Sequence, residues 1–143
     1  TFKGDILKHL INKGGSVLNG ELFIKPINMN KSEIVKILLN NGCDASYTDV
    51  KKNNLLHMAG SKERTDIARL LIATNKIDIN AKNDVGDSPL HLVVSTKNLE
   101  LTQVYVEAGA DINAKNSMGK VVFKVAKGSK VKKYLKGKGA KKK

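Results

Sequence analysis

Aromatic residues and cysteine are scarce in this chain of 143 residues. With no Trp, three Phe and three Tyr, its core has to be built in thin layers from Leu, Ile, Val and Ala. The only cysteine, Cys43, excludes an internal disulfide, and one Cys with three His offers no zinc-ligand spacing. The apolar runs are far shorter than the roughly 18 residues of a membrane span. We therefore expect one compact domain without disulfides, structural zinc or membrane helices.

Acidic residues are missing from the C-terminal fifth of the chain. Residues 115–143 carry 12 lysines and no Asp or Glu, whereas residues 1–114 carry 14 basic and 13 acidic residues. The net charge of +13 is therefore a property of the C-terminal end. The last lysines form a basic tail: Lys136, Lys138, Lys141, Lys142 and Lys143.

Two interpretations of this tail are open. It can be a solvated, disordered end, or it can attach the protein electrostatically to nucleic acid, an acidic membrane or an acidic protein, or serve as a nuclear-import signal. The tail has no Arg for bidentate base contacts, and only Tyr134 lies nearby for stacking. Binding of nucleic acid through the tail would therefore be weak, salt-sensitive and independent of base sequence.

Motifs for catalysis or cofactor binding are also lacking. Gly86 and Gly119 belong to no phosphate-binding glycine loop. Asp44, Asp78 and Asp111 recur about one repeat apart, but catalytic carboxylates have to converge on one cleft. We assign no catalytic, metal-binding or cofactor-binding residue and no small-molecule substrate, and we expect the protein not to be an enzyme.

Internal repeats are the strongest positive signal. Asn-Asn-Leu-Leu-His-Met-Ala (53–59) and Asp-Ser-Pro-Leu-His-Leu-Val (87–93) stand 34 residues apart. The segments 76–83 and 109–116 share Asp-Ile-Asn-Ala-Lys-Asn and stand 33 residues apart. Self-similarity at such a period is the signature of a repeat architecture in which each unit buries its apolar face against its neighbours.

Each period is predicted to form two short helices. The first begins at Ser88, whose hydroxyl can cap the free N–H groups of a helix with Pro89 in its first turn. The second follows Asn98 and ends before Gly109, a residue suited to a left-handed C-cap. The predicted packing faces, at helical spacing, are Leu90, Val93 and Val94 in the first helix and Leu101, Val104 and Tyr105 in the second.

These residues resemble the ankyrin repeat, whose motif runs Gly-x-Thr-Pro-Leu-His-x-Ala, then Gly-x-x-Glu-Ile-Val, then Leu-Leu-x-x-Gly-Ala-Asp-x-Asn. The resemblance implies an all-α solenoid of stacked helix-turn-helix units joined by β-hairpin-like loops. The copy at 19–48 has lost the Thr-Pro-Leu-His box, and its Pro26 should kink or shorten the first helix. The best match, residues 83–115, has Gly86, Ser88, Pro89, Leu90, His91, Leu99, Glu100, Gly109, Ala110, Asp111 and Asn113 at family positions.

The resemblance covers a repeat domain at 1–136, with about four to five repeats, followed by a Lys-rich disordered tail at 137–143. The terminal copies are incomplete, and the last is expected to cap the stack with a polar outer face. The expected boundaries are 2–18 for a partial first copy, then 19–48, 49–82, 83–115, and 116–136 for the cap.

Three conspicuous residues receive structural interpretations. His57 and His91 recur in equal register, which is compatible with metal or acid–base chemistry. The resemblance instead implies a structural histidine that hydrogen-bonds between loop and helix and between neighbouring repeats. Cys43 stands at the family's Ala position, and we expect a buried, inert thiol because reactivity needs an electropositive, accessible setting.

In this family, the hairpin tips and first helices line a concave binding side. Val50, Val85 and Met118 would form an apolar stripe along it, which favours a partner over scattered exposed aliphatics. Asn28 and Met29 would extend the row. The predicted protein-binding residues are Thr48, Val50, Lys51, Asn53, Ser61, Lys62, Lys82, Asp84, Val85, Asp87, Ser95, Thr96, Lys115, Ser117, Met118 and Lys120.

The function implied is a non-catalytic, monomeric module that binds a protein partner through this face. An alternative is an electrostatic adaptor whose Lys-rich C-terminus binds nucleic acid or acidic membrane. A further alternative, from the fold alone, is an inhibitor of a Rel-type transcription factor or a pathogen effector. A single free cysteine suits a reducing compartment, so we expect a cytoplasmic or nuclear location, or delivery into a host cell.

Overall fold

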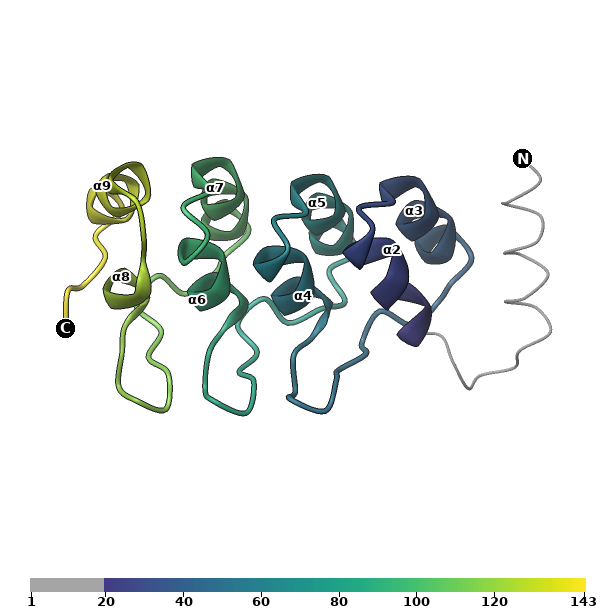
Figure 1. Cartoon of the computed structure of the whole chain (residues 1–143), viewed down its shortest axis with the longest axis horizontal. Coiled ribbons are helices and arrows are strands. Elements are labelled where there is room, and N and C mark those ends of the chain that lie inside the picture. The colour runs from purple at the N-terminus through teal and green to yellow at the C-terminus, as the bar shows by residue number, and fades with distance from the viewer. Residues whose placement is uncertain (1–19) are drawn as a thin grey trace.

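The computed structural model describes residues 20–143. Its helices follow one another in antiparallel pairs (Figure 1). The partial first copy expected at 2–18 lies outside the described residues. The elements are the 3₁₀ helix η2 (Glu21–Phe23), α2 (Ile24–Asn28), α3 (Ser32–Asn40), α4 (Leu55–Ser61), α5 (Thr65–Ala73), α6 (Pro89–Val94), α7 (Leu99–Glu107), α8 (Val122–Val125) and α9 (Ser129–Gly137).

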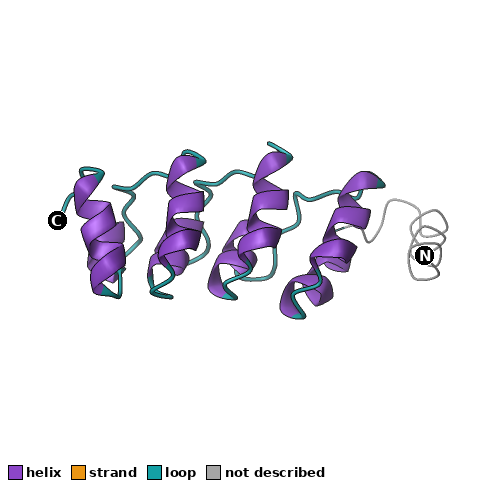
Figure 2. Ribbon diagram, turned by 90° about the horizontal axis from the view of Figure 1, so that it is seen from above, coloured by secondary structure: helices purple, strands orange, loops and turns teal. Residues whose placement is uncertain are grey.

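The helix pairs stack side by side in two layers. An inner row runs α2, α4, α6, α8, and an outer row runs α3, α5, α7, α9; each helix contacts the next one in its own row. From above, the four pairs form one line of parallel units (Figure 2). The predicted all-α solenoid is thereby confirmed. Within residues 20–143, no helix is both long and apolar enough to cross a membrane.

Side-chain caps define where the two middle inner helices, α4 and α6, begin. Asn54 accepts a hydrogen bond from the backbone N–H of His57 at 3.0 Å, and the ring of His57 accepts one from the N–H of Asn54 at 3.1 Å. Ser88 and His91 form the same reciprocal arrangement, with Pro89 as the first residue of α6. These capping boxes satisfy backbone N–H groups that a helix start leaves unpaired. The predicted start at Ser88-Pro89 agrees with the structure.

A left-handed residue makes each tight turn from inner to outer helix. The turn residues are Asn30 (φ 55°), Glu63 (φ 56°), Lys97 (φ 68°) and Gly128 (φ 84°). Glu and Lys rarely adopt a positive φ, because the Cβ atom crowds the backbone there. The stacking of the two helices therefore imposes a conformation at Glu63 and Lys97 that their residue types do not favour.

The core is a continuous apolar layer between the two rows. It consists of aliphatic side chains with two buried aromatics, Phe23 and Tyr105, in keeping with the scarcity of large rings. The Tyr105 hydroxyl is satisfied because it donates to the carbonyl of Leu56 at 2.7 Å, which joins α7 to the inner helix of the preceding repeat. The burial is therefore shared between repeats, as a solenoid requires.

The inner helices at the two ends of the described chain are short. In the copy at 19–48, α2 has only five residues and follows a single 3₁₀ turn, in agreement with the short helix expected from Pro26. In the last, α8 has only four residues, and α9 ends at Gly137. After α9, the N–H of Ala140 donates to the Leu135 carbonyl at 3.0 Å, and that of Lys141 donates to Asn113 Oδ1 at 2.8 Å. The chain therefore stays attached to the stack through Lys141.

The contact between α4 and α6 depends on a glycine. A Cβ atom added to Gly60 would lie 2.6 Å from Val93 Cγ2 and 3.3 Å from the Tyr105 hydroxyl. Val93 is fully buried and β-branched, so it has little freedom to move away. A side chain at residue 60 would force the two inner helices apart.

We predict that Gly60→Ala destabilises the protein although alanine is the better helix former. Overpacking costs about 1–3 kcal/mol, whereas the gain in helix propensity is about 1 kcal/mol at most. The matched control is Gly137→Ala in α9, where an added Cβ has no atom within 4 Å. Urea denaturation should show a lower free energy of unfolding for Gly60→Ala only; equal or higher stability would contradict the tight α4–α6 contact.

Candidate functional site

Three hairpin loops project from the same edge of the stack, each just before an inner helix (Figure 1). Thr48 pairs with Asn54 and Lys115 with Val121 as isolated antiparallel bridges. In the middle loop, the N–H of Asn83 donates to the carbonyl of Asp87 at 3.0 Å. The loops therefore have the β-hairpin-like form that the resemblance implies.

Backbone hydrogen bonds connect the tips of neighbouring hairpins. The N–H of Asp84 donates to the Lys51 carbonyl at 2.9 Å, and the N–H of Ser117 donates to the Val85 carbonyl at 3.1 Å. The two bonds lie at the same place in successive pairs of hairpins. The three tips consequently form one continuous ridge.

Side-chain amides add a second set of bonds between the hairpins. Asn83 Nδ2 donates to Asn53 Oδ1 at 2.9 Å, and Asn116 Nδ2 donates to Asp87 Oδ1 at 2.9 Å. The oxygen of each Asn also accepts N–H groups of its own tip, so Asn83 and Asn116 shape the turn as well. Sequence reasoning missed these two residues, although their equal register with Asp49 was a usable signal.

Three large apolar side chains stand exposed along this ridge, and a fourth, Met29, is exposed at the C-terminal end of α2. Val50 and Met118 expose the largest fractions of their surface, and Val85 and Met29 are about half exposed. Together they are the exposed large hydrophobic residues of the described chain: Met29 at 55%, Val50 at 99%, Val85 at 54% and Met118 at 72%. The structure thus places the predicted stripe in solvent, and its role in binding stays a prediction.

The predicted protein-binding residues divide by exposure. Twelve are exposed, and four are partly buried: Asn53, Asp87, Ser95 and Thr96. Asn53 and Asp87 are engaged in the bonds between hairpins, and the hydroxyls of Ser95 and Thr96 donate to the carbonyls of Leu92 and Val93 at 2.6 Å each. These four therefore support the face more than they present groups to a partner.

His57 and His91 are structural. The buried ring of His57 accepts from the N–H of Asn54 through Nδ1, so Nε2 carries the proton and donates to the Asp87 carbonyl at 2.8 Å. His91 repeats the arrangement toward the Lys120 carbonyl at 3.2 Å. Each histidine thus ties a helix start to the hairpin of the next repeat. Burial lowers the pKa of His57 because the protonated ring would lose hydration.

The remaining candidate groups also have structural positions. Cys43 is buried, and this burial raises the pKa of its thiol, so little reactive thiolate forms. Asp44, Asp78 and Asp111 each accept the N–H two residues ahead at 2.9 Å and shape the turn after an outer helix. In the described part of the chain, His, Cys, Asp and Glu form no group of three that could hold a metal ion.

Comparison with known proteins identifies the repeat. A family model described as ankyrin repeats (3 copies) matches residues 22–116. Alpha-latrocrustotoxin-Lt1a of Latrodectus tredecimguttatus is 32% identical over 110 residues, which are 77% of this chain and 8% of that protein. The nuclear factor NF-kappa-B p105 subunit of Rattus norvegicus is 30% identical over 113 residues, or 78% of this chain and 12% of that protein.

A viral protein shows a similar match. The putative ankyrin repeat protein R96 of Acanthamoeba polyphaga mimivirus is 29% identical over 116 residues, which are 77% of this chain and 11% of that protein. The chain thus spans only 8–12% of the length of these three relatives. What it shares with them is the repeat stack.

We predict that His57 makes the stability of the stack pH-dependent near neutrality. The folded state favours the neutral ring, so its contribution is fully present above the unfolded pKa of about 6.5 and is lost as pH falls from there toward the lowered folded pKa. Asp and Glu titrate mostly below about pH 5. Urea denaturation at pH 7.5, 6.5 and 5.5 should show stability falling with pH.

His57→Gln provides the control for this prediction. It should lower the free energy of unfolding at pH 7.5 by about 1–3 kcal/mol, since buried partners lose a hydrogen bond. It should also flatten the pH dependence between 7.5 and 5.5. An equally steep dependence in the variant would show that other groups cause it.

Proposed function

Because the chain belongs to the ankyrin-repeat family, whose repeats generally mediate protein–protein interaction, we propose that it is a non-catalytic module that binds a partner protein through its hairpin ridge. The contact surface is formed by the tips at Val50, Val85 and Met118 and by the exposed ends of the inner helices. This proposal rests on the surface of this chain and on the general role of its family, since its similarity to the relatives covers only a small part of their length.

The observation that carries the proposal is the line of exposed apolar side chains. Val50 is 99% and Met118 is 72% exposed, and both lie on loops that the stack holds side by side. Burying such side chains contributes about 1.5–3 kcal/mol each. Soluble proteins seldom leave apolar residues aligned on one edge unless a partner covers them.

Charged and polar residues flank these side chains and would set specificity. Lys51, Lys82 and Lys115 lie on one hairpin after another, and Asp84 lies at the tip of the middle one. All four are exposed. The arrangement is that of a protein interface with apolar contacts at its centre and a polar rim.

The ridge is organised before any partner arrives. The bonds between tips, the Asn83 and Asn116 amides and the two histidines hold the hairpins in register. A partner therefore meets loops whose backbone is already ordered, and less conformational entropy is lost on binding. A rigid ridge suits either a folded protein surface or an extended segment.

We predict that replacing Val50, Val85 and Met118 together with Glu abolishes binding of the partner. Three buried carboxylates without partners would oppose the interface, because uncompensated buried charge is strongly unfavourable. All three sites are exposed in the free protein, so its helical circular dichroism and melting temperature should change little. Partner capture should be measured by cross-linking and mass spectrometry with a photoreactive amino acid at residue 84, which is exposed at the tip of the middle hairpin and is not changed in the variant.

A matched control places the same charge on the outer row. Asn40, Ala73 and Ala108 are exposed at the ends of α3, α5 and α7, and their triple change to Glu should leave capture intact. In the chain without these substitutions, cross-links from a photoreactive residue at 73, rather than 84, would place the interface on the outer helices. Equal capture by both triple variants would refute binding through the ridge.

A further inference from the structure

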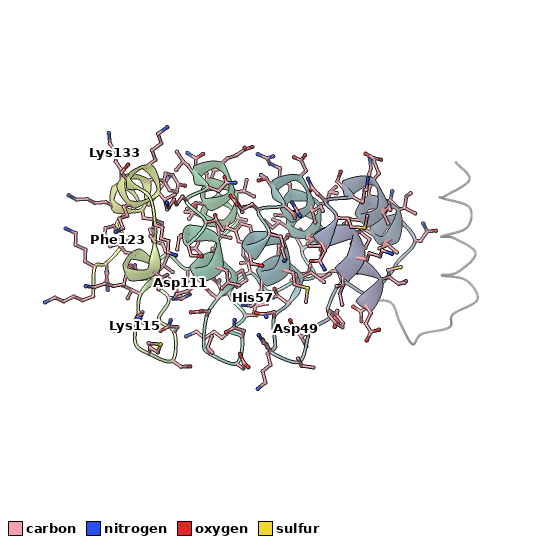
Figure 3. All side chains as sticks on the ribbon, viewed as in Figure 1. Asp49, His57, Asp111, Lys115, Phe123 and Lys133 are labelled. Carbon is pink, nitrogen blue, oxygen red and sulfur yellow. The ribbon has the colours of Figure 1, made fainter. Side chains whose placement is uncertain are left out.

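The end of the stack formed by α8, α9 and the residues after them is strongly cationic. Residues 120–143 contain 11 lysines and no acidic residue, and every one of these lysines is exposed. Figure 3 shows nitrogen-tipped side chains that project from this end, with Lys133 of α9 pointing away from the stack. The ion pairs found within residues 20–143 both belong to Arg69, so none involves these lysines.

The lysines belong to an ordered surface. Helix α9 buries Val131 and Leu135 completely and keeps Lys130, Lys132, Lys133 and Lys136 in solvent. We call these four residues the α9 lysines. Lys130 and Lys133 also line a groove of about 470 Å³ between α7 and α9, together with Lys138. The helix thus holds the charges in fixed relative positions, as a disordered tail would not.

Some of these lysines occupy repeat positions that carry other residue types in the preceding repeats. Lys124 stands where the preceding repeats have His57 and His91, and Lys141 stands where they have Asp111. The backbone is retained, because Asn113 Oδ1 accepts the N–H of Lys141 just as Asn80 Oδ1 accepts that of Asp111. Side chains that serve packing and turns elsewhere are therefore replaced by cations at this end.

We propose that this lysine-rich end binds the phosphate backbone of double-stranded nucleic acid without reading its sequence. Along α9, four ammonium groups are spread over about 9 Å of helix axis. A nucleic-acid duplex presents one negative charge per about 1.7 Å of its axis, which gives about five phosphates over the same length. The charge densities of the two surfaces are therefore similar.

The structure favours this occupant over an acidic protein. Protein interfaces rely on aromatic and Arg anchors, and Lys is depleted in them. Residues 115–143 contain no Arg. Their aromatic residues are only partly exposed, and the hydroxyl of Tyr134 is buried. Phosphate binding needs no such anchor, since release of counterions drives it.

The structure also favours nucleic acid over a membrane. A basic helix that binds a lipid surface buries an apolar face among the lipids. In α9, this face is already buried in the stack through Val131 and Leu135. Base stacking on Tyr134 is disfavoured as well, because the Lys138 ammonium lies over its ring, 5.7 Å from the centroid, where a base would stack.

The test measures binding of a fluorescently labelled 20-base-pair DNA duplex by anisotropy at 50, 100 and 200 mM NaCl. Changing the four α9 lysines together to Gln should weaken binding at 100 mM NaCl by on the order of 10-fold or more. The salt dependence should also become weaker, so that the negative slope of log K against log salt concentration becomes smaller in magnitude by about 3 to 4. The variant should fold normally, because all four sites are exposed and Gln is a good helix former.

Two control variants separate position from net charge. Changing Lys25, Lys36, Lys62 and Lys76 to Gln removes the same charge from exposed sites elsewhere and should change the affinity and the slope much less. Changing the α9 lysines to Arg should preserve binding. Equal losses in both Gln variants, or no loss in the α9 variant, would overturn the proposal.

Other polyanions test the choice of partner. Binding of vesicles with 30% phosphatidylserine, or of polyglutamate, that is tighter than duplex binding at 150 mM NaCl would overturn the assignment to nucleic acid. The Glu triple variant of the ridge should still bind the duplex, because all four α9 lysines are unchanged in it. A failure of one proposal is therefore distinguishable from a failure of the other.

Discussion

The structure depends on the lateral burial of one inner helix against the next. Helices α4, α6 and α8 have four to seven residues and are too short to be stable alone in water. They persist because Leu56, Leu90 and their neighbours are buried between adjacent repeats. Gly60 permits the close approach of α4 and α6, and His57 joins a helix cap to the next hairpin. Each repeat is thus both folded and placed by its neighbours.

The same stacking generates two different surfaces. Along the edge, it lines up the hairpins, and bonds such as Asp84 N–H to the Lys51 carbonyl convert separate loops into a ridge. At the C-terminal end of the described chain, the outer helix α9 is covered with lysine. A partner protein on the ridge and nucleic acid at the end would occupy different parts of the molecule, so one chain has room to bind both.

Much of the site was predictable because residues at the same position of successive repeats lie next to one another in the stack. The exposure of Val50, Val85 and Met118 follows from their place in the hairpin, and the buried roles of His57 and His91 follow from the resemblance to ankyrin repeats. Asn83 and Asn116 were missed because each side chain donates a hydrogen bond to the hairpin of the preceding repeat, and that contact forms only when the repeats stack. The left-handed turns at Glu63 and Lys97 carry no signal in their residue types, because packing of the flanking helices imposes them.

The sequence alone determined the period, the helix starts and the accumulation of lysine after residue 115, because these depend on residue type and spacing. Tertiary structure decided which polar side chains form hydrogen bonds within the protein, as Asn53 and Asp87 do, and which face solvent. It also decided that α9 holds its lysines in an ordered array, because Val131 and Leu135 are buried against the preceding repeat. Hydrogen bonds and burial between distant residues arise only when the repeats stack, so no local pattern encodes them.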